Sequence, residues 1–166
     1  DNVAGGVMAG EHIVSLLGGK GKVVELEGIA GTSAARDRGQ GFNDAIAGTE
    51  IEVVAKQVAD FDRTQGLTVM ENILQAQPEI DAVFAHNDEM ALGAQKAIEA
   101  SGREIIIVGF DATDDAVAAV KEGKMSATVA QQPSLIGELG VETAKKILDG
   151  ESVEDFVPVD LQLVTE

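Results

Sequence analysis

Short apolar runs alternate with longer amphipathic segments from one end of the chain to the other. The apolar runs predict strands at residues 22–26, 51–57, 82–85, 105–109, 127–130 and 159–164. The segments between them place apolar residues at helical spacing and predict helices at residues 3–17, 33–47, 63–77, 88–100, 114–122 and 134–148. Glycine or proline follows several of these helices, as Gly18, Gly48 and Pro78 do, and both residue types commonly stop a helix.

This alternation predicts the fold class. Strands that alternate with helices favour an α/β fold, in which helices cover both faces of a mostly parallel sheet. The run Ile105-Ile106-Ile107-Val108 is apolar throughout, as expected for a central parallel strand buried on both faces. We therefore expect a doubly wound, flavodoxin-like parallel sheet with right-handed crossovers.

Composition and charge narrow the classes of partner. The chain has 166 residues, of which 45% are apolar, and fits one globular domain. It carries 12 basic and 29 acidic residues, a formal net charge of −17. So acidic a chain repels phosphate backbones and anionic lipids, and we expect no nucleic-acid partner. The apolar runs are far shorter than the roughly 20 residues that cross a bilayer, so we expect no membrane insertion.

The residue types argue against several kinds of catalytic and metal site. The chain has no cysteine, which removes disulfides, thiolate catalysis and zinc–thiolate centres. His12 and His86 stand far apart, and neither lies in a His-x3-His or Glu-x-x-His pattern. No GxSxG nucleophile elbow is present. We therefore expect no enzyme, no metal site and no cofactor.

A set of mostly polar residues follows five successive predicted strands. The set is Arg38, Phe61, Asn87, Asp111 and Gln131. In an open parallel sheet, ligands bind just beyond the carboxyl ends of the strands. One arginine, one aromatic ring, two amides and one carboxylate supply the paired donors and acceptors that hydroxyl groups require. The sequence therefore predicts a site that binds a small polyhydroxylated molecule.

Members of this set also have plainer interpretations. Arg36 and Arg38 lie two residues apart on one predicted helix, so only one of them faces the cleft, and the other interpretation is a solvated surface arginine. Asn87 is a good N-cap for the helix that follows it. Asp111 equally fits a cap or turn residue after its strand.

The loop Gly28-Ile29-Ala30-Gly31-Thr32-Ser33 is a separate candidate site. Backbone N–H groups ahead of a helix can hold a phosphate, which would suit a flavodoxin-like phosphate or nucleotide binder or an enzyme. The loop matches neither the P-loop nor the GxGxxG pattern. The plainer interpretation is a tight turn with Thr32 or Ser33 as N-cap.

Four stretches of the chain closely resemble bacterial ribose-binding proteins, the solute receptors of sugar ABC importers. They are GIAGTSAARDRGQGF (28–42), ADFDR (59–63), VFAHNDEMALG (83–93) and VGFD (108–111). The resemblance covers essentially the whole chain and implies the two-lobed, periplasmic-binding-protein-like I fold, whose lobes close on D-ribose. By this resemblance, Arg38, Asn87, Asp111 and Gln131 hydrogen-bond the sugar and Phe61 stacks on it.

The resemblance also implies a domain organisation. Residues 1–131 correspond to the C-terminal sugar-binding lobe, residues 132–160 to a segment that crosses to the N-terminal lobe, and residues 161–166 to a final strand. The implied partners are D-ribose, the N-terminal lobe and the ABC permease. Because half of the site is on the other lobe, we expect this chain alone to bind ribose weakly.

The resemblance implies a periplasmic or extracytoplasmic location. The opening Asp1-Asn2-Val3 lacks the pattern of a signal peptide and indicates a processed, truncated or engineered end, and an internal-start product would be cytoplasmic. A rival is the effector lobe of a LacI-type repressor, which shares the fold. That rival would require a DNA headpiece ahead of Asp1, which we do not expect.

The predicted helix at 134–148 carries an apolar stripe. Its members are Leu135, Ile136, Leu139, Ala144, Ile147 and Leu148. Leaving such a stripe in water costs a few kcal/mol, at about 25 cal/mol per Å². We therefore expect this helix to fold back on its own sheet as a fifth crossover helix, or to dock on a second copy in a homodimer.

Overall fold

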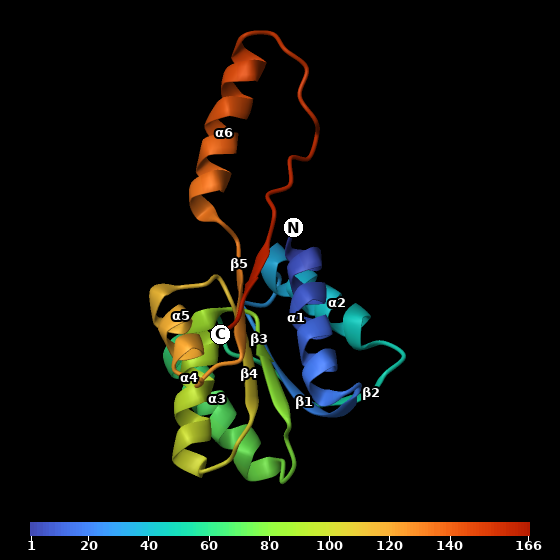
Figure 1. The fold of residues 1–166 in the computed structure, drawn as a ribbon, viewed down its shortest axis with the longest axis vertical. Helices are drawn as coiled ribbons and strands as arrows, with labels where there is room; N and C mark the ends of the chain where they lie inside the picture. The colour runs from blue at the N-terminus through green and yellow to red at the C-terminus, as the bar shows by residue number, and fades with distance from the viewer.

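A single sheet with helices on both faces forms the body of the molecule (Figure 1). The computed structural model describes all 166 residues. The strands are β1 (Lys20–Glu27), β2 (Glu50–Val58), β3 (Ala82–Ala85), β4 (Ile106–Phe110), β5 (Ala127–Ala130) and β6 (Gln162–Val164). The helices are α1 (Asn2–Leu17), α2 (Ser33–Ile46), α3 (Arg63–Ala76), α4 (Asp88–Ser101), α5 (Asp114–Lys121) and α6 (Pro133–Leu148). The predicted α/β alternation is confirmed, although β6 begins later than expected.

The order of the strands is β2-β1-β3-β4-β5-β6. The first five strands in this order are parallel, and β6 pairs antiparallel to β5. The order 2-1-3-4-5 is that of flavodoxin-like sheets, so this prediction is confirmed. Because the order reverses between β1 and β3, the loops that follow these two strands diverge and leave room for a ligand at the carboxyl edge.

Two apolar layers hold the helices on the sheet. Helices α1 and α2 cover one face around Phe42, Phe84 and Phe110, and α3, α4 and α5 cover the other around Met70 and Met90 (Figure 1). Phe42 and Phe84 stack with ring centroids 4.9 Å apart. Every one of these five side chains is fully buried, so burial of apolar surface supplies the main driving force for this arrangement.

Glycines bring α1 and α2 into backbone contact. A Cβ atom on Gly41 would lie 2.0 Å from the carbonyl oxygen of Val3, and one on Gly6 would lie 2.1 Å from that of Arg38. No side chain fits into such a space. The close approach fixes α2 against the start of α1 and thereby positions Arg38 at the sheet edge.

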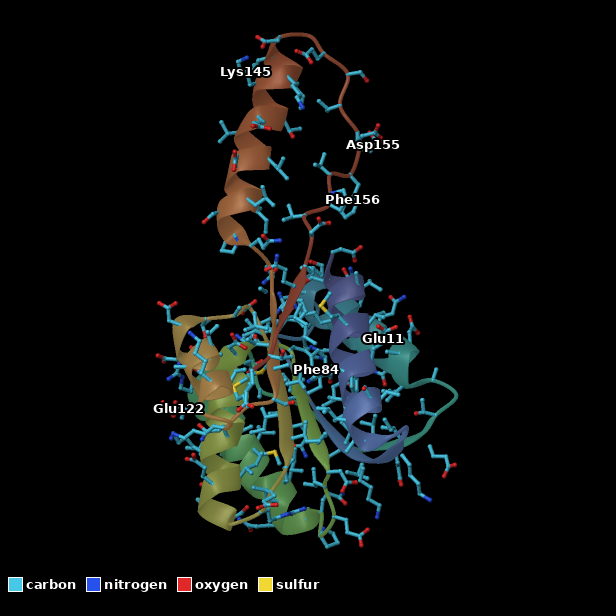
Figure 2. The ribbon with its side chains drawn as sticks, viewed as in Figure 1. Glu11, Phe84, Glu122, Lys145, Asp155 and Phe156 are labelled. Atoms are coloured by element: carbon cyan, nitrogen blue, oxygen red, sulfur yellow. The ribbon has the colours of Figure 1, made fainter.

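The segment of residues 132–160, here called the arm, projects away from the sheet (Figures 1 and 2). The arm consists of α6 and a returning stretch without regular secondary structure, and α6 has no buried residue. The prediction that this helix packs on its own sheet is wrong. Both faces of the sheet are already covered, β6 occupies the edge beside β5, and Gln132, with φ 55°, turns the chain outward. No helix of the chain has the length and apolar character needed to cross a membrane.

The tight contact between α1 and α2 yields a stability prediction. Replacing Gly41 by alanine forces the two backbones apart and should lower the free energy of unfolding by about 1–3 kcal/mol. Gly137 in α6 has open space around its Cα, so Gly137→Ala is the matched control and should leave stability unchanged or slightly raised. Urea unfolding followed by circular dichroism measures both. Equal stability of the two variants would contradict this packing.

Candidate functional site

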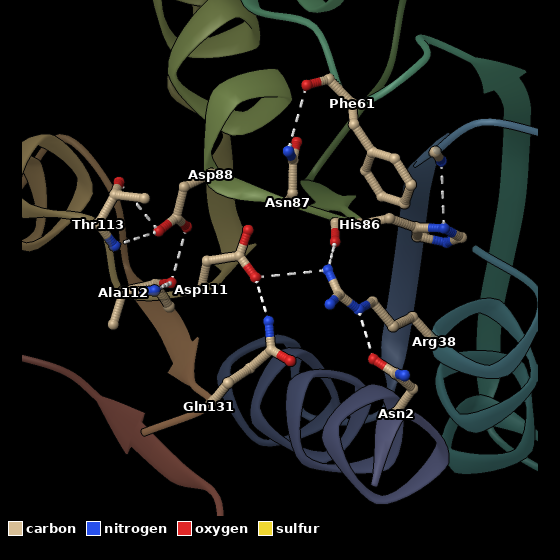
Figure 3. A network of polar contacts seen from close by, with 12 residues as sticks. Asn2, Arg38, Phe61, His86, Asn87, Asp88, Asp111, Ala112, Thr113 and Gln131 are labelled. Atoms are coloured by element: carbon tan, nitrogen blue, oxygen red, sulfur yellow. Dashed lines mark hydrogen bonds and ion pairs between the residues drawn. The ribbon is translucent and has the colours of Figure 1, made fainter. Parts of the chain in front are cut away.

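The five side chains predicted to form a binding site lie together at the carboxyl edge of the sheet (Figure 3). Arg38 comes from α2, Phe61 from the β2–α3 loop, Asn87 from the start of α4, and Asp111 and Gln131 directly follow β4 and β5. Arg38 Nη1 lies 3.6 Å from Asp111 Oδ1, and Gln131 Nε2 donates to the same oxygen. Asn87 Nδ2 donates to the carbonyl oxygen of Phe61 at 3.2 Å. The structure therefore brings all five into one cluster, here called the rim.

Arg38 is the buried centre of this cluster, with 6% of its surface exposed. Its Nε donates to Asn2 Oδ1 at 2.9 Å and its Nη1 to the carbonyl oxygen of His86 at 2.5 Å. The guanidinium carbon lies 3.8 Å from the centre of the Phe110 ring. Burial lowers the pKa of Arg38, while the charges of Asp111 and Asp88 oppose that shift. The group remains a cation at neutral pH.

Arg36 is the solvated surface arginine of the two arginines in α2. Its side chain is exposed and its Nε donates to Asp37 Oδ1 at 2.8 Å. Arg38 is therefore the arginine that faces the site, and Arg36 is a surface residue.

Asp111 and Gln131 present unused polar atoms beside Arg38. Burial raises the pKa of Asp111, and Arg38 and the hydrogen bond from Gln131 oppose the shift. Three polar atoms here have no hydrogen-bond partner: Asp111 Oδ2, Gln131 Oε1 and Arg38 Nη2. None of them is buried, because Gln95 Nε2 is the only buried side-chain polar atom without a partner. The three free atoms at the rim are thus accessible. One donor group and two acceptors so placed suit hydroxyl groups, which both donate and accept.

Phe61 and Asn87 form the other side of the cluster. Phe61 has φ 57°, and its ring lies against Gly28, where a Cβ atom would be 2.0 Å from Cζ. Asn87 Oδ1 accepts from the backbone N–H of Met90 at 3.0 Å. The N-cap interpretation of Asn87 is therefore confirmed, and the same side chain also holds the Phe61 loop. A larger residue at position 28 would displace the ring.

Left-handed backbone conformations concentrate at this edge. The non-glycine residues with positive φ are Asp60, Phe61, Asp111, Ala112 and Gln132. Such conformations cost on the order of 1–3 kcal/mol each and persist only where the surroundings enforce them. Phe61 and Asp111 of the rim have positive φ themselves, and Gln132 directly follows Gln131 of the rim. The edge is therefore the strained part of the chain.

A buried pair behind the rim was missed in the sequence, where His86 was considered only as a metal ligand. His86 Nε2 lies 3.0 Å from Glu25 Oε1, and His86 Nδ1 accepts from the backbone N–H of Gly28 at 3.3 Å. Because Nδ1 accepts a hydrogen bond from the N–H of Gly28, we assign the ring proton to Nε2, which donates to Glu25. The available signal was Glu25 itself, an acid between the apolar residues Val24 and Leu26, all three of which are fully buried.

Glu25 is held in its charged form. Burial raises its pKa, but hydrogen bonds from His86 and Asn43 and the charge of Lys56 outweigh burial, so the net shift is downward. Asn43 Nδ2 donates to Glu25 Oε2 at 3.1 Å. This network fixes His86, whose carbonyl oxygen receives Arg38. The pair therefore supports the rim from behind.

The glycine-rich loop at residues 28–33 forms the tight turn of the plainer interpretation. Thr32 caps α2, with its Oγ1 accepting from the N–H of Ala35 at 3.3 Å and donating to the carbonyl oxygen of Ile29 at 2.8 Å. Thr32 thus stabilises the turn, and Gly28 of the same loop supports the Phe61 ring.

Comparison with known proteins agrees with this geometry. A family model described as periplasmic binding protein domain matches residues 1–152. The ribose import binding protein RbsB of Haemophilus influenzae is 60% identical over 166 residues, which are 100% of this chain and 57% of that protein. RbsB of Bacillus subtilis is 57% identical over 166 residues, which are 54% of its length. The chain therefore spans just over half the length of these relatives.

Solved structures with bound small polyols share the fold. A periplasmic solute binding protein of an ABC transporter from Actinobacillus succinogenes, with bound D-allose, superposes with a TM-score of 0.95 at 35% identity, over 99% of this chain and 59% of that one. A solute binding protein from Bacillus halodurans, with bound myo-inositol, gives 0.93 at 39% identity, over 99% and 58%. The sheet order, the polar carboxyl edge and these matches lead to one conclusion: the chain belongs to the periplasmic binding protein family.

Proposed function

We propose that this chain is the C-terminal lobe of a D-ribose receptor of an ABC importer, with Arg38, Phe61, Asn87, Asp111 and Gln131 as its half of the sugar site. The convergence of these side chains at the carboxyl edge carries the proposal. The identity of 60% to a ribose import binding protein supports ribose as the ligand. The proposed location is the periplasm or another extracytoplasmic space.

The free atoms of the rim set the proposed mode of binding. Arg38 Nη2 donates to a ribose oxygen, and Asp111 Oδ2 accepts from a hydroxyl group. Hydrogen bonds to charged groups contribute about 1.5–3 kcal/mol each, more than those between neutral groups. The exposed face of the Phe61 ring packs on the C–H groups of the sugar. No bond is broken in this scheme, so the proposed activity is binding and delivery.

The arm supplies the proposed contact with the rest of the receptor. Its apolar side chains border a hollow of about 390 Å³ between α6 and the returning stretch. The hollow is lined by Ile136, Leu139, Gly140, Thr143, Ala144, Ile147, Val157 and Val159. We propose that the N-terminal lobe covers this surface in the complete receptor. A homodimer, in which a second copy covers it, is the competing arrangement.

The rival functions gain no support. The loop at residues 28–33 uses Thr32 to cap α2 and uses Gly28 to support Phe61, which favours a structural role over phosphate binding. The relatives reported above are binding proteins of sugar import, and none is a LacI-type repressor.

The second prediction concerns the two halves of the site. Titration of this chain with D-ribose should give a Kd of about 1 mM or weaker, because half of the sugar stays exposed. Addition of the separately produced N-terminal lobe of the H. influenzae relative should tighten the Kd to about 1 μM. Calorimetry measures both. FMN and nucleotides serve as controls, and tight binding of either that is abolished by changes at Gly31 would contradict the proposal.

The third prediction uses the two arginines of α2. Arg38→Gln should weaken ribose binding roughly 30-fold, or about 2 kcal/mol, because a charged donor is lost from the site. Arg36→Gln is the matched control on the same helix and should bind ribose as the parent chain does. Calorimetry in the presence of the N-terminal lobe provides the affinities, and thermal melts check that both variants are folded. Equal affinities for the two variants would argue against a ligand role for Arg38.

A further inference from the structure

We infer that Asp88 is a positioning residue of the sugar site, which holds Asp111 in place through the β4–α5 loop without touching the ligand. This inference rests on the function proposed above and adds to it a residue that lies outside the rim. Asp88 is the first residue of α4 and has no exposed surface. In Figure 3 its carboxylate faces Ala112 and Thr113, the two residues that follow Asp111.

Both carboxylate oxygens of Asp88 are used to hold this loop. Oδ2 accepts from the backbone N–H of Thr113 at 2.8 Å and from Thr113 Oγ1 at 3.2 Å. Oδ1 accepts from Thr128 Oγ1 at 2.7 Å, and Thr128 Oγ1 in turn accepts from the backbone N–H of Ala112 at 3.1 Å. The N–H groups of both residues after Asp111 are therefore tied to Asp88, one directly and one through Thr128.

The loop needs such a tie because its backbone is strained. Asp111 has φ 117° and Ala112 has φ 53°, conformations that non-glycine residues leave unless other contacts enforce them. On the other side, the N–H of Asp111 donates to the carbonyl oxygen of Val129 at 2.8 Å. These hydrogen bonds together fix the direction in which the Asp111 carboxylate leaves the backbone. Asp88 supplies the acceptors on the α4 side.

Gly109 in β4 leaves room for the Asp88 carboxylate. A Cβ atom at Gly109 in β4 would lie 2.3 Å from Asp88 Oδ1. Only glycine at that position allows the carboxylate to reach Thr113 and Thr128. The tie is thus built from β4, β5 and α4 together.

A contribution to stability alone does not explain a carboxylate here. Burial raises the pKa of Asp88 to about 6, against the opposing hydrogen bonds from Thr128 and Thr113, and the charge of Asp111 raises it further. Because the folded-state pKa lies above the ordinary value, the contribution of this group to stability falls as the pH rises from about 4 to about 6. The charged form at neutral pH therefore costs stability. The presence of Asp88 is better explained by the loop that its carboxylate oxygens hold, at Ala112 and Thr113.

Helix capping is the plainer role for an acid at this position. Asp88 and Glu89 both lie in the first turn of α4, where negative charge complements the helix dipole. Glu89 is half-buried and pairs with Arg63 at 2.8 Å, and no hydrogen bond joins it to the loop after Asp111. Glu89 therefore shares the dipole role without the tie, which makes it the matched control.

A double-mutant cycle with Asp111 tests the inference. Ribose affinity is measured by NMR titration of this chain together with the N-terminal lobe, at a temperature well below the melting point of every variant. Asp88→Ala should weaken binding at least 10-fold when Asp111 is present and less than 2-fold in an Asp111→Ala background, because the residue that it positions is then gone. Glu89→Ala should change affinity less than 2-fold in either background.

Two further measurements separate positioning from general stability. Asp88→Asn should bind within about 3-fold of the parent chain, because its Oδ1 can accept from Thr113 while its Nδ2 donates to Thr128 Oγ1. In the ligand-free chain, the amide protons of Ala112 and Thr113 should exchange at least 10-fold faster in Asp88→Ala and no faster in Asp88→Asn or Glu89→Ala.

The outcomes distinguish this inference from the proposed function. Equal losses on Asp88→Ala in both backgrounds, unchanged affinity, or unchanged amide exchange would each overturn the positioning role while ribose binding stands. Failure of the unmodified chain to bind ribose with the N-terminal lobe would overturn the proposed function and this role with it.

Discussion

The burial of the Arg38 guanidinium is the constraint on which the site depends. A buried cation must find acceptors for its N–H groups, because an unpaired one costs several kcal/mol. Asn2 at the start of α1 and the carbonyl of His86 after β3 supply acceptors, and Asp111 after β4 supplies the opposite charge. These groups come from separate elements, so the guanidinium can be satisfied only when the elements meet at one edge. Glycine contacts between α1 and α2 bring Arg38 to that point.

The remaining rim is held by polar residues that lie behind it. Glu25 and His86 support the carbonyl that receives Arg38 and the N–H of Gly28, on which Phe61 rests. Asp88 ties down the loop that carries Asp111. Backbone strain and buried polar groups, both unfavourable by themselves, are thus concentrated where a rigid ligand rim is needed. The apolar layers on the two faces of the sheet supply the stability that offsets them.

Much of this architecture could be predicted from the sequence, because local signals and the global fold agree. Apolar periodicity and the stop at Gly18 define the helices and strands, and the strand-end rule places Arg38 and Asp111 on one edge. Periodicity alone does not place the arm, because its apolar stripe shows that the helix needs a partner but not which one. Only the family resemblance marks residues 132–160 as a segment that crosses to another lobe. The Glu25–His86 pair and the hydrogen bond from Thr113 to Asp88 were also not predicted. They join residues that are 61 and 25 positions apart. Such contacts depend on strand order and side-chain direction, which periodicity does not encode.

The central claim is that five side chains at the carboxyl edge form one half of a ribose site. NMR of this chain, isotopically labelled and mixed with unlabelled N-terminal lobe, tests the claim most directly. Addition of D-ribose should shift the side-chain resonances of Arg38, Asn87 and Gln131 and the ring resonances of Phe61, and should leave the loop at residues 29–33 unchanged. Shifts confined to that loop, or no shift at the rim at saturating ribose, would contradict the account.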